Sequence, residues 1–217
     1  MAQAPSTNPV LQGALAGLAP GIAVGHRLIA PGDDVALLDE EAQSITSAVV
    51  AVRRASGTAR LVARDLLKRL GYPACSVPKT KSGAPAWPAG VIGSLAHDEQ
   101  IAVAAVALRR DFEALGVDVE PAEPLPPDVL DLVATARERA GLGNDPLRGR
   151  LLFAAKEAVY KALYPRHRVF LEYHDIEVDL AAGNAVVRKE RGLELRFCIA
   201  KHVVILAFSR AAATVAA

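Results

Sequence analysis

Two short motifs place charged residues inside apolar sequence, and their residue types could support metal-dependent chemistry. The first is Gly-Val-Asp-Val-Glu at residues 116–120, and the second is Lys-Glu-Ala-Val-Tyr-Lys at residues 156–161. The apolar alternation of the first motif predicts a strand, so Asp118 and Glu120 share one face and lie about 7 Å apart. Two carboxylates on one face repel each other unless a cation lies between them.

The second motif lies in an apolar helical pattern at residues 151–163, which Pro165 is expected to end. Glu157 and Lys161 have i,i+4 spacing and share a face of that helix. If this face meets the strand, three carboxylates form an all-oxygen ligand set that suits magnesium, with manganese as the alternative. Lysines beside such a metal favour a polyphosphate substrate. The predicted metal ligands are Asp118, Glu120 and Glu157.

Each motif alone has a simpler structural explanation. An Asp-x-Glu sequence is usually a solvated strand edge, and a Glu-Lys pair at i,i+4 spacing is usually a surface pair worth a few tenths of a kcal/mol. Only the order and the combination of the motifs favour a functional site.

Together with Trp87-Pro88 and the Gly-Ser-Leu-Ala-His sequence at residues 93–97, the two motifs resemble the Sfp-like 4′-phosphopantetheinyl transferases, near the branch of enterobactin-synthetase component D. The resemblance extends from about Arg53 to the C-terminus. It implies transfer of the 4′-phosphopantetheine arm of coenzyme A to a serine of an apo acyl or peptidyl carrier protein. Adenosine 3′,5′-bisphosphate would be released.

The resemblance also implies roles for individual residues. Glu157 would be a metal ligand and the general base, acting directly or through a metal-bound water, and Lys161 would balance charge in the transition state. His97 would contact phosphates of the coenzyme. The cations expected to contact coenzyme A are Arg53, Arg60, Lys79 and Lys81 at the 3′-phosphate, and Lys156 and Lys161 at its other phosphates.

Two departures from the family pattern leave alternatives open. Ala96 and Ala154 stand where the family commonly has a hydroxyl residue. One alternative is a degenerate paralogue that binds coenzyme A or a carrier protein without turnover. The other is a magnesium-dependent transferase that cleaves a different pyrophosphate. A buried acidic trio costs stability without its metal, which argues against a pure binding module.

Composition limits the partners. The 217 residues are 52% hydrophobic with mean hydropathy +0.23, enough for a substantial core. Lys and Arg total 25 against 24 Asp and Glu, so no overall field attracts nucleic acid or an anionic membrane. Cys75 and Cys198 lack metal-ligand spacing. Residues 1–25 contain no Lys or Arg, and no apolar run is long enough to span a bilayer. We expect a cytoplasmic protein, and the resemblance implies a monomer.

An internal similarity indicates two halves. Residues 61–73 match residues 153–165 with basic on basic, acidic on acidic and Tyr-Pro on Tyr-Pro, although helix patterning alone could produce this. The resemblance implies an α+β fold of two similar lobes related by pseudo-twofold symmetry, with the active site in the cleft between them. The expected lobes are residues 1–115, which bind the 3′-phosphate of coenzyme A, and residues 116–217, which carry the metal site and the catalytic helix.

Local patterns predict further elements. A strand is expected at residues 21–25, and acidic residues 39–41 are expected to open a helix running toward Arg53. A second helix is predicted from about Thr58 to Leu70, and another at residues 128–139. Residues 1–10 are expected to form a loose terminus, and residues 121–127 an extended segment. The resemblance implies that the insert between the two motifs contacts the carrier protein.

Overall fold

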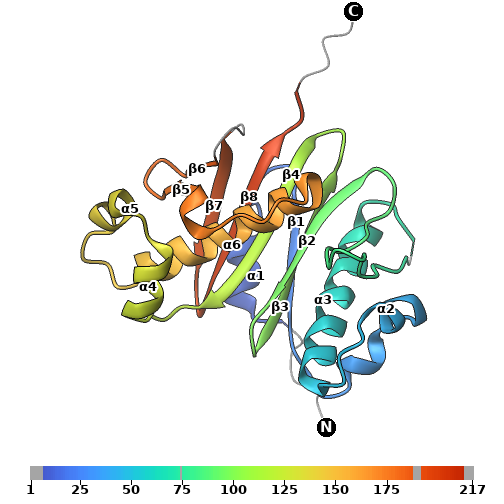
Figure 1. The fold of residues 1–217 in the computed structure, drawn as a ribbon. Coiled ribbons are helices and arrows are strands. Elements are labelled where there is room, and N and C mark those ends of the chain that lie inside the picture. The colour runs from blue at the N-terminus through green and yellow to red at the C-terminus, as the bar shows by residue number, and fades with distance from the viewer. Residues whose placement is uncertain (1–6, 74, 188–191, 213–217) are drawn as a thin grey trace, which may run out of the picture.

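The structure is a computed structural model that describes residues 7–73, 75–187 and 192–212 (Figure 1). The first half contains α1 (Pro9–Leu15), β1 (Ala23–Leu28), η1 (Asp33–Ala36), α2 (Asp39–Ser44), α3 (Val50–Arg69), β2 (Val91–His97) and β3 (Ile101–Leu108). The second half contains β4 (Phe112–Pro121), α4 (Pro127–Val133), α5 (Ala136–Gly141), α6 (Arg148–His167), η2 (Tyr173–Asp175), β5 (Ile176–Asp179), β6 (Asn184–Val187), β7 (Leu193–Ile199) and β8 (His202–Arg210).

The strands form two antiparallel sheets. The first has the order β1-β3-β2, and the second has the order β4-β8-β7-β6-β5. The expected lobe boundary at residues 115 and 116 lies inside β4, which belongs to the second sheet throughout.

Each sheet is covered by one long helix, and the other faces of the two sheets share a core. Helix α3 packs on the first sheet through Val62, Leu66 and Leu67, and α6 packs on the second through Ala155 and Val159. Leu11 and Leu15 of α1 join residues from both sheets in the shared core. This arrangement of two α/β lobes confirms the predicted α+β fold (Figure 1).

The predicted helices are present with different boundaries. The first acidic helix ends at Ser44, before a segment that contains the β-branched residues Ile45, Thr46 and Val49, and α3 then begins at Val50 instead of Thr58. The helix expected at residues 128–139 is two short helices, because Thr135 begins α5 as its N-cap.

Helix α6 also differs from its prediction. It continues past Pro165 to His167, since a proline in the last turn removes only one terminal hydrogen bond, and it ends at Arg168 with a left-handed φ of 54°. At the N-terminus, α1 begins at Pro9 inside the expected loose segment, of which residues 1–6 lie outside the described residues.

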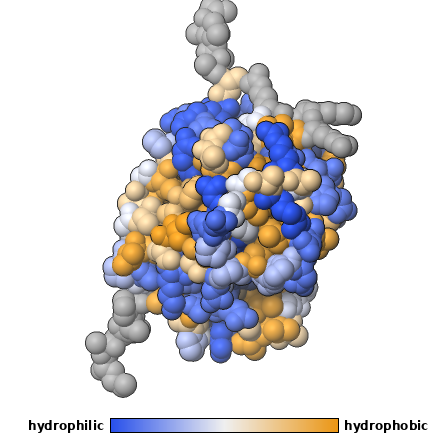
Figure 2. All heavy atoms as spheres, turned by 90° about the vertical axis from the view of Figure 1, so that its left-hand side faces the viewer, coloured by the Kyte–Doolittle hydropathy of each residue, from blue (hydrophilic) through white to orange (hydrophobic). Residues whose placement is uncertain are grey.

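The surface on the side of α4 and α5 mixes hydrophilic and hydrophobic residues (Figure 2). Within the described residues, no helix has both the length and the apolar character needed to cross a membrane.

Candidate active site

Strand β4 and helix α6 bring the two sequence motifs together. Ala114 packs in the core beneath α6, while Val117 and Val119 pack in the core between the sheets. Strand alternation therefore directs Asp118 and Glu120 toward α6, as predicted. Gly116 permits this contact, because a Cβ atom there would lie 1.9 Å from the backbone oxygen of Ala158.

Asp118 is the buried centre of the cluster. Asp118 is only 5% exposed, and its Oδ1 accepts a hydrogen bond from Nζ of Lys161 at 2.6 Å. Burial raises the pKa of Asp118 to about 6, with smaller upward contributions from Glu120 and Glu157, although Lys161 opposes the shift. Its Oδ2 is buried and has no hydrogen-bond partner among the described residues.

The other two carboxylates each have a different partner. Arg150 donates from its Nη1 to Oε2 of Glu120 at 2.8 Å, while burial raises the pKa of Glu120 despite this contact. Tyr173 donates its hydroxyl to Oε1 of Glu157 at 2.9 Å. Burial first, and the Glu157 carboxylate second, raise the pKa of Tyr173 to about 12.

The carboxylates do not form a closed ligand shell. In the described part of the chain, no three His, Cys, Asp or Glu side chains are grouped so that they could hold a metal ion. The residue chemistry nevertheless fits a hard cation, because carboxylate oxygens are its preferred ligands and none of the described residues donates to Oδ2 of Asp118. The metal site with Asp118, Glu120 and Glu157 as ligands therefore stays a prediction.

Cationic groups converge beside the carboxylates. His97, at the end of β2, has a pKa below its ordinary value, first because the surrounding protein desolvates it and then because Lys161 lies nearby. Lys79, which is exposed on the loop of residues 76–81, makes a smaller contribution that also lowers the pKa of His97. A cavity of about 700 Å³ begins here, lined by the N-terminal turns of α3, the turn after His97, Glu120 and Arg150.

Two predicted phosphate ligands lie elsewhere. Lys156 is fully buried, and its ammonium donates to Oε2 of Glu138 at 2.7 Å and to the carbonyls of Val133 and Tyr173 at 2.9 and 2.8 Å. All three N–H donors are therefore used inside the lobe, and the prediction that Lys156 reaches a phosphate is wrong for this arrangement.

Arg60 is also buried, being 4% exposed. Its Nε donates to the carbonyl of Val77 at 2.8 Å, and its Nη1 donates to the carbonyl of Ser56 at 3.1 Å. These contacts give Arg60 a structural role in place of the predicted direct one. Arg53 is half-buried and donates to the carbonyl of Ile45 at 3.1 Å, whereas Lys79 and Lys81 are exposed on their loop.

Arg150 and Tyr173 were not predicted as site residues. Arg150 could have been found, because it precedes Glu157 by two helical turns on the same face of α6. Tyr173 has no sequence signal, since it lies in a three-residue 3-10 helix after an irregular segment.

A cluster of carboxylates paired with a lysine, at the junction of two α/β lobes, is the type of site expected for phosphoryl-group chemistry. Residues 40–107 match the family described as the 4′-phosphopantetheinyl transferase N-terminal domain, and residues 114–216 match the 4′-phosphopantetheinyl transferase superfamily. The chain belongs to this family.

Curated relatives agree with this assignment. The chain is 40% identical over 185 residues to 4′-phosphopantetheinyl transferase Svp of Streptomyces mobaraensis, covering 80% of this chain and 75% of that protein. It is 37% identical over 145 residues to PptT of Mycobacterium tuberculosis, covering 65% and 64%. Enterobactin synthase component D of Salmonella typhimurium is 35% identical over 88 residues, or 38% of this chain and 36% of that protein. The protein is thus an enzyme that transfers 4′-phosphopantetheine from coenzyme A to carrier proteins.

Proposed function

We propose that this transfer takes place in the cavity between α3, β4 and α6, and that it depends on magnesium, with manganese as the alternative, bound by Asp118, Glu120 and Glu157. The observation that supports this most directly is the buried Oδ2 of Asp118, which has no hydrogen-bond partner within residues 7–73, 75–187 and 192–212 and lies beside two further carboxylates. Such an oxygen is destabilising unless a donor or a cation satisfies it. When bound, the cation supplies neutralisation of the diphosphate and of the charge that grows on the leaving phosphate.

The protein side chains have separate tasks in this proposal. Glu157 takes up the proton of the attacking serine, and the Tyr173 hydroxyl orients the carboxylate by donating to its Oε1. Lys161 places its positive charge beside the diphosphate. His97 contributes hydrogen bonds in its neutral form, because its pKa is lowered.

The coenzyme would bind mainly through the first lobe. We assign the 3′-phosphate to Lys79, with Arg53 and Lys81 as further cations, and the phosphates nearer the reacting centre to His97 and Lys161. In this assignment, residues 1–115 supply the coenzyme site and residues 116–217 the metal site and the catalytic helix. The reaction would take place in a cytoplasmic monomer.

The partner is an apo acyl or peptidyl carrier protein that presents a serine at the cavity. The insert that carries α4 and α5 is the proposed contact surface, where Arg137 has a side chain 81% exposed. Arg139 and Arg150 pair closely with Asp131 and Glu120, at 2.7 and 2.8 Å, whereas Nε of Arg137 lies 3.9 Å from Glu177. Its weaker pairing and greater exposure make Arg137 the better candidate for an acidic carrier helix.

The alternative of a binding protein without turnover loses its main support. Ala154 is fully buried in the core beneath α6, and Ala96 is 4% exposed in the core between the sheets. Both side chains point into hydrophobic cores and away from the cavity. A hydroxyl at either position would therefore not contact a phosphate bound there.

Intact-mass analysis tests the proposed function. The purified protein is incubated with coenzyme A, magnesium and a panel of apo carrier proteins from fatty-acid, polyketide and nonribosomal-peptide systems. We expect the mass of one phosphopantetheine arm to be added to at least one carrier, and EDTA to prevent it. Transfer that persists fully in EDTA, or in Asp118→Ala, would refute the metal site, whereas binding of coenzyme A with no transfer to any carrier would favour the degenerate paralogue.

A further inference from the structure

The loop that carries Lys79 has little secondary structure to fix it. Residues 76–81 lie between α3 and β2. An isolated bridge joins Lys79 to Pro85, and the N–H groups of Thr80 and Ala86 donate to the carbonyls of Ala84 and Pro78, both at 2.8 Å. A flexible lysine on such a loop would lose conformational entropy on binding a phosphate, unless the backbone is held in place beforehand. The local turn ties residues 78–86 to one another, and contacts from α2 and α3 join residues 76–79 to the rest of the lobe.

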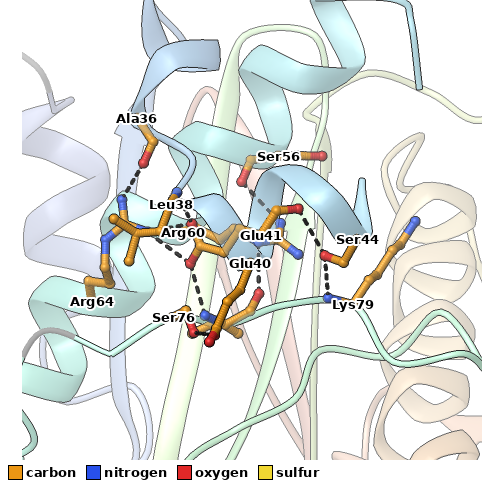
Figure 3. Close-up of polar contacts among 11 residues, drawn as sticks. Ala36, Leu38, Glu40, Glu41, Ser44, Ser56, Arg60, Arg64, Ser76 and Lys79 are labelled. Carbon is orange, nitrogen blue, oxygen red and sulfur yellow. Dashed lines mark hydrogen bonds and ion pairs between the residues drawn. The ribbon is translucent and has the colours of Figure 1, made fainter. Parts of the chain in front are cut away.

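Glu41 is the centre of these contacts (Figure 3). It is 0% exposed, and its Oε1 accepts a hydrogen bond from the backbone N–H of Val77 at 2.8 Å. Its Oε2 accepts from the N–H of Leu38 at 2.9 Å, while Nη1 of Arg64 donates to Oε1 at 2.9 Å and to Oε2 at 2.7 Å. The carboxylate is thus fully satisfied, and it joins the loop to both helices.

Ser44 makes the direct contact to Lys79. Its hydroxyl donates to the carbonyl of Glu41 at 2.9 Å and accepts the backbone N–H of Lys79 at 2.8 Å (Figure 3). Arg60 completes the support by donating to the carbonyl of Val77 at 2.8 Å. The loop is therefore anchored at the residue that carries the lysine side chain and at Val77, two positions before it, while that side chain stays exposed.

The second lobe contains the same kind of buried carboxylate without a phosphate-binding loop. Glu138 accepts from the N–H groups of Thr135 and Val178, both at 2.8 Å, and pairs with Lys156 at 2.7 Å. Like Glu41, it is buried and binds two backbone N–H groups and one cation, but the segment that it anchors is β5. Glu138 is therefore a matched control for the loss of a buried carboxylate.

We propose that Glu41 and Ser44 are positioning residues for coenzyme A, holding the backbone of the 76–79 loop so that Lys79 meets the 3′-phosphate. Neither residue touches the coenzyme in this proposal. It rests on the proposed function of Lys79, and the experiment separates the two.

The test compares coenzyme A with 3′-dephospho-coenzyme A, which lacks only the group that Lys79 is proposed to bind. The measured quantity is the ratio of kcat/KM for coenzyme A to kcat/KM for the dephospho form. We expect Ser44→Ala to lower this ratio about threefold to tenfold, the equivalent of one lost hydrogen bond, chiefly through KM for coenzyme A. Ser44→Thr, which keeps the hydroxyl, should restore it.

The remaining variants separate positioning from general stability. Lys79→Ala should lower the ratio about tenfold or more, because a charge-assisted contact is lost. Glu41→Gln should lower it at least as much as Ser44→Ala. Glu138→Gln should leave the ratio unchanged whatever its overall rate, and so should Ser47→Ala, whose exposed hydroxyl accepts from Val49 and not from the loop.

The outcomes are distinguishable. If Lys79→Ala lowers the ratio but Ser44→Ala and folded Glu41→Gln do not, the positioning role is wrong and the 3′-phosphate site stands. If Lys79→Ala leaves the ratio unchanged, the assignment of Lys79 fails and the positioning role fails with it. Calorimetric titration of the metal-free protein with adenosine 3′,5′-bisphosphate should rank the variants by affinity in the same order as the kcat/KM ratio does. Equal affinities in all variants would overturn the proposal.

Discussion

Replacing Lys156 with methionine should destabilise the protein strongly without affecting the binding of coenzyme A directly. Methionine nearly preserves the length of the side chain but removes the ammonium group, which donates hydrogen bonds to Glu138 and to two backbone carbonyls. Glu138 is left as a buried charge with only two backbone donors, and breaking such a pair costs about 3–5 kcal/mol. Because whole domains are stable by about 5–15 kcal/mol, this is a large share of the free energy of unfolding.

Urea unfolding at 25 °C would measure the loss, and steady-state kinetics at a temperature where the variant stays folded would measure KM for coenzyme A. Glu138→Leu combined with Lys156→Met should recover part of the stability, since no buried charge remains. We expect KM for coenzyme A to stay within about threefold of the native value. A variant of native stability whose KM for coenzyme A rises about tenfold would show that Lys156 binds a phosphate, and would refute the structural role.

Three further predictions concern the junction of β4 and α6. In the metal-free protein, the raised pKa of Asp118, about 6, means that the native state binds a proton more tightly than the unfolded state, so this group reduces stability as pH rises from about 4 to about 7. Asp118→Asn should therefore raise the free energy of unfolding in EDTA by up to about 3 kcal/mol near neutral pH and much less near pH 4, while transfer is lost. Equal effects at both pH values in urea titrations would contradict the buried carboxylate. Gly116→Ala should lower Tm by several degrees, because its Cβ would lie 1.9 Å from the backbone oxygen of Ala158, and an unchanged Tm in calorimetry would argue against this packing. Tyr173→Phe should lower kcat about tenfold with little change in KM for coenzyme A, because Glu157 loses the donor that orients it, and a native kcat would exclude this role.

The sequence was sufficient to predict the features that depend on local periodicity. Alternation in β4 placed Asp118 and Glu120 on one face, and helical spacing placed Glu157 and Lys161 on the face of α6 that meets it. These conclusions needed only the period of each element and the assumption that the two faces meet.

Local pattern did not predict which charged side chains are buried. Lys156 and Arg60 looked like phosphate ligands because cations in a family motif are usually assigned to the ligand, but each pairs with groups far away in the chain. The partner of Lys156 is Glu138, whose Thr-x-x-Glu capping sequence at residues 135–138 is readable, although its second function of accepting from a buried lysine is not. Long-range pairing of this kind depends on how the helices dock, which no short window contains.

The similarity between residues 61–73 and 153–165 now has a structural basis that helix patterning does not provide. In that alignment Arg64 corresponds to Lys156, and both bind a buried glutamate in the first turn of a short helix earlier in the chain, Glu41 in one lobe and Glu138 in the other. An amphipathic pattern would explain matching apolar faces, but it would not explain why two aligned cations both pair with a buried glutamate.

The next aligned pair shows where the two lobes differ. Asp65 corresponds to Glu157, yet Asp65 is exposed, while Glu157 is half-buried and held by Tyr173. Each lobe thus uses a buried carboxylate to fix one segment: Glu41 fixes the loop of Lys79, and Glu138, through Lys156, fixes the backbone of Tyr173. Disrupting Glu41 should therefore affect chiefly the affinity for coenzyme A, because the loop of Lys79 is proposed to bind the coenzyme. Disrupting Glu138 should affect chiefly the rate of transfer, because Tyr173 is proposed to orient Glu157.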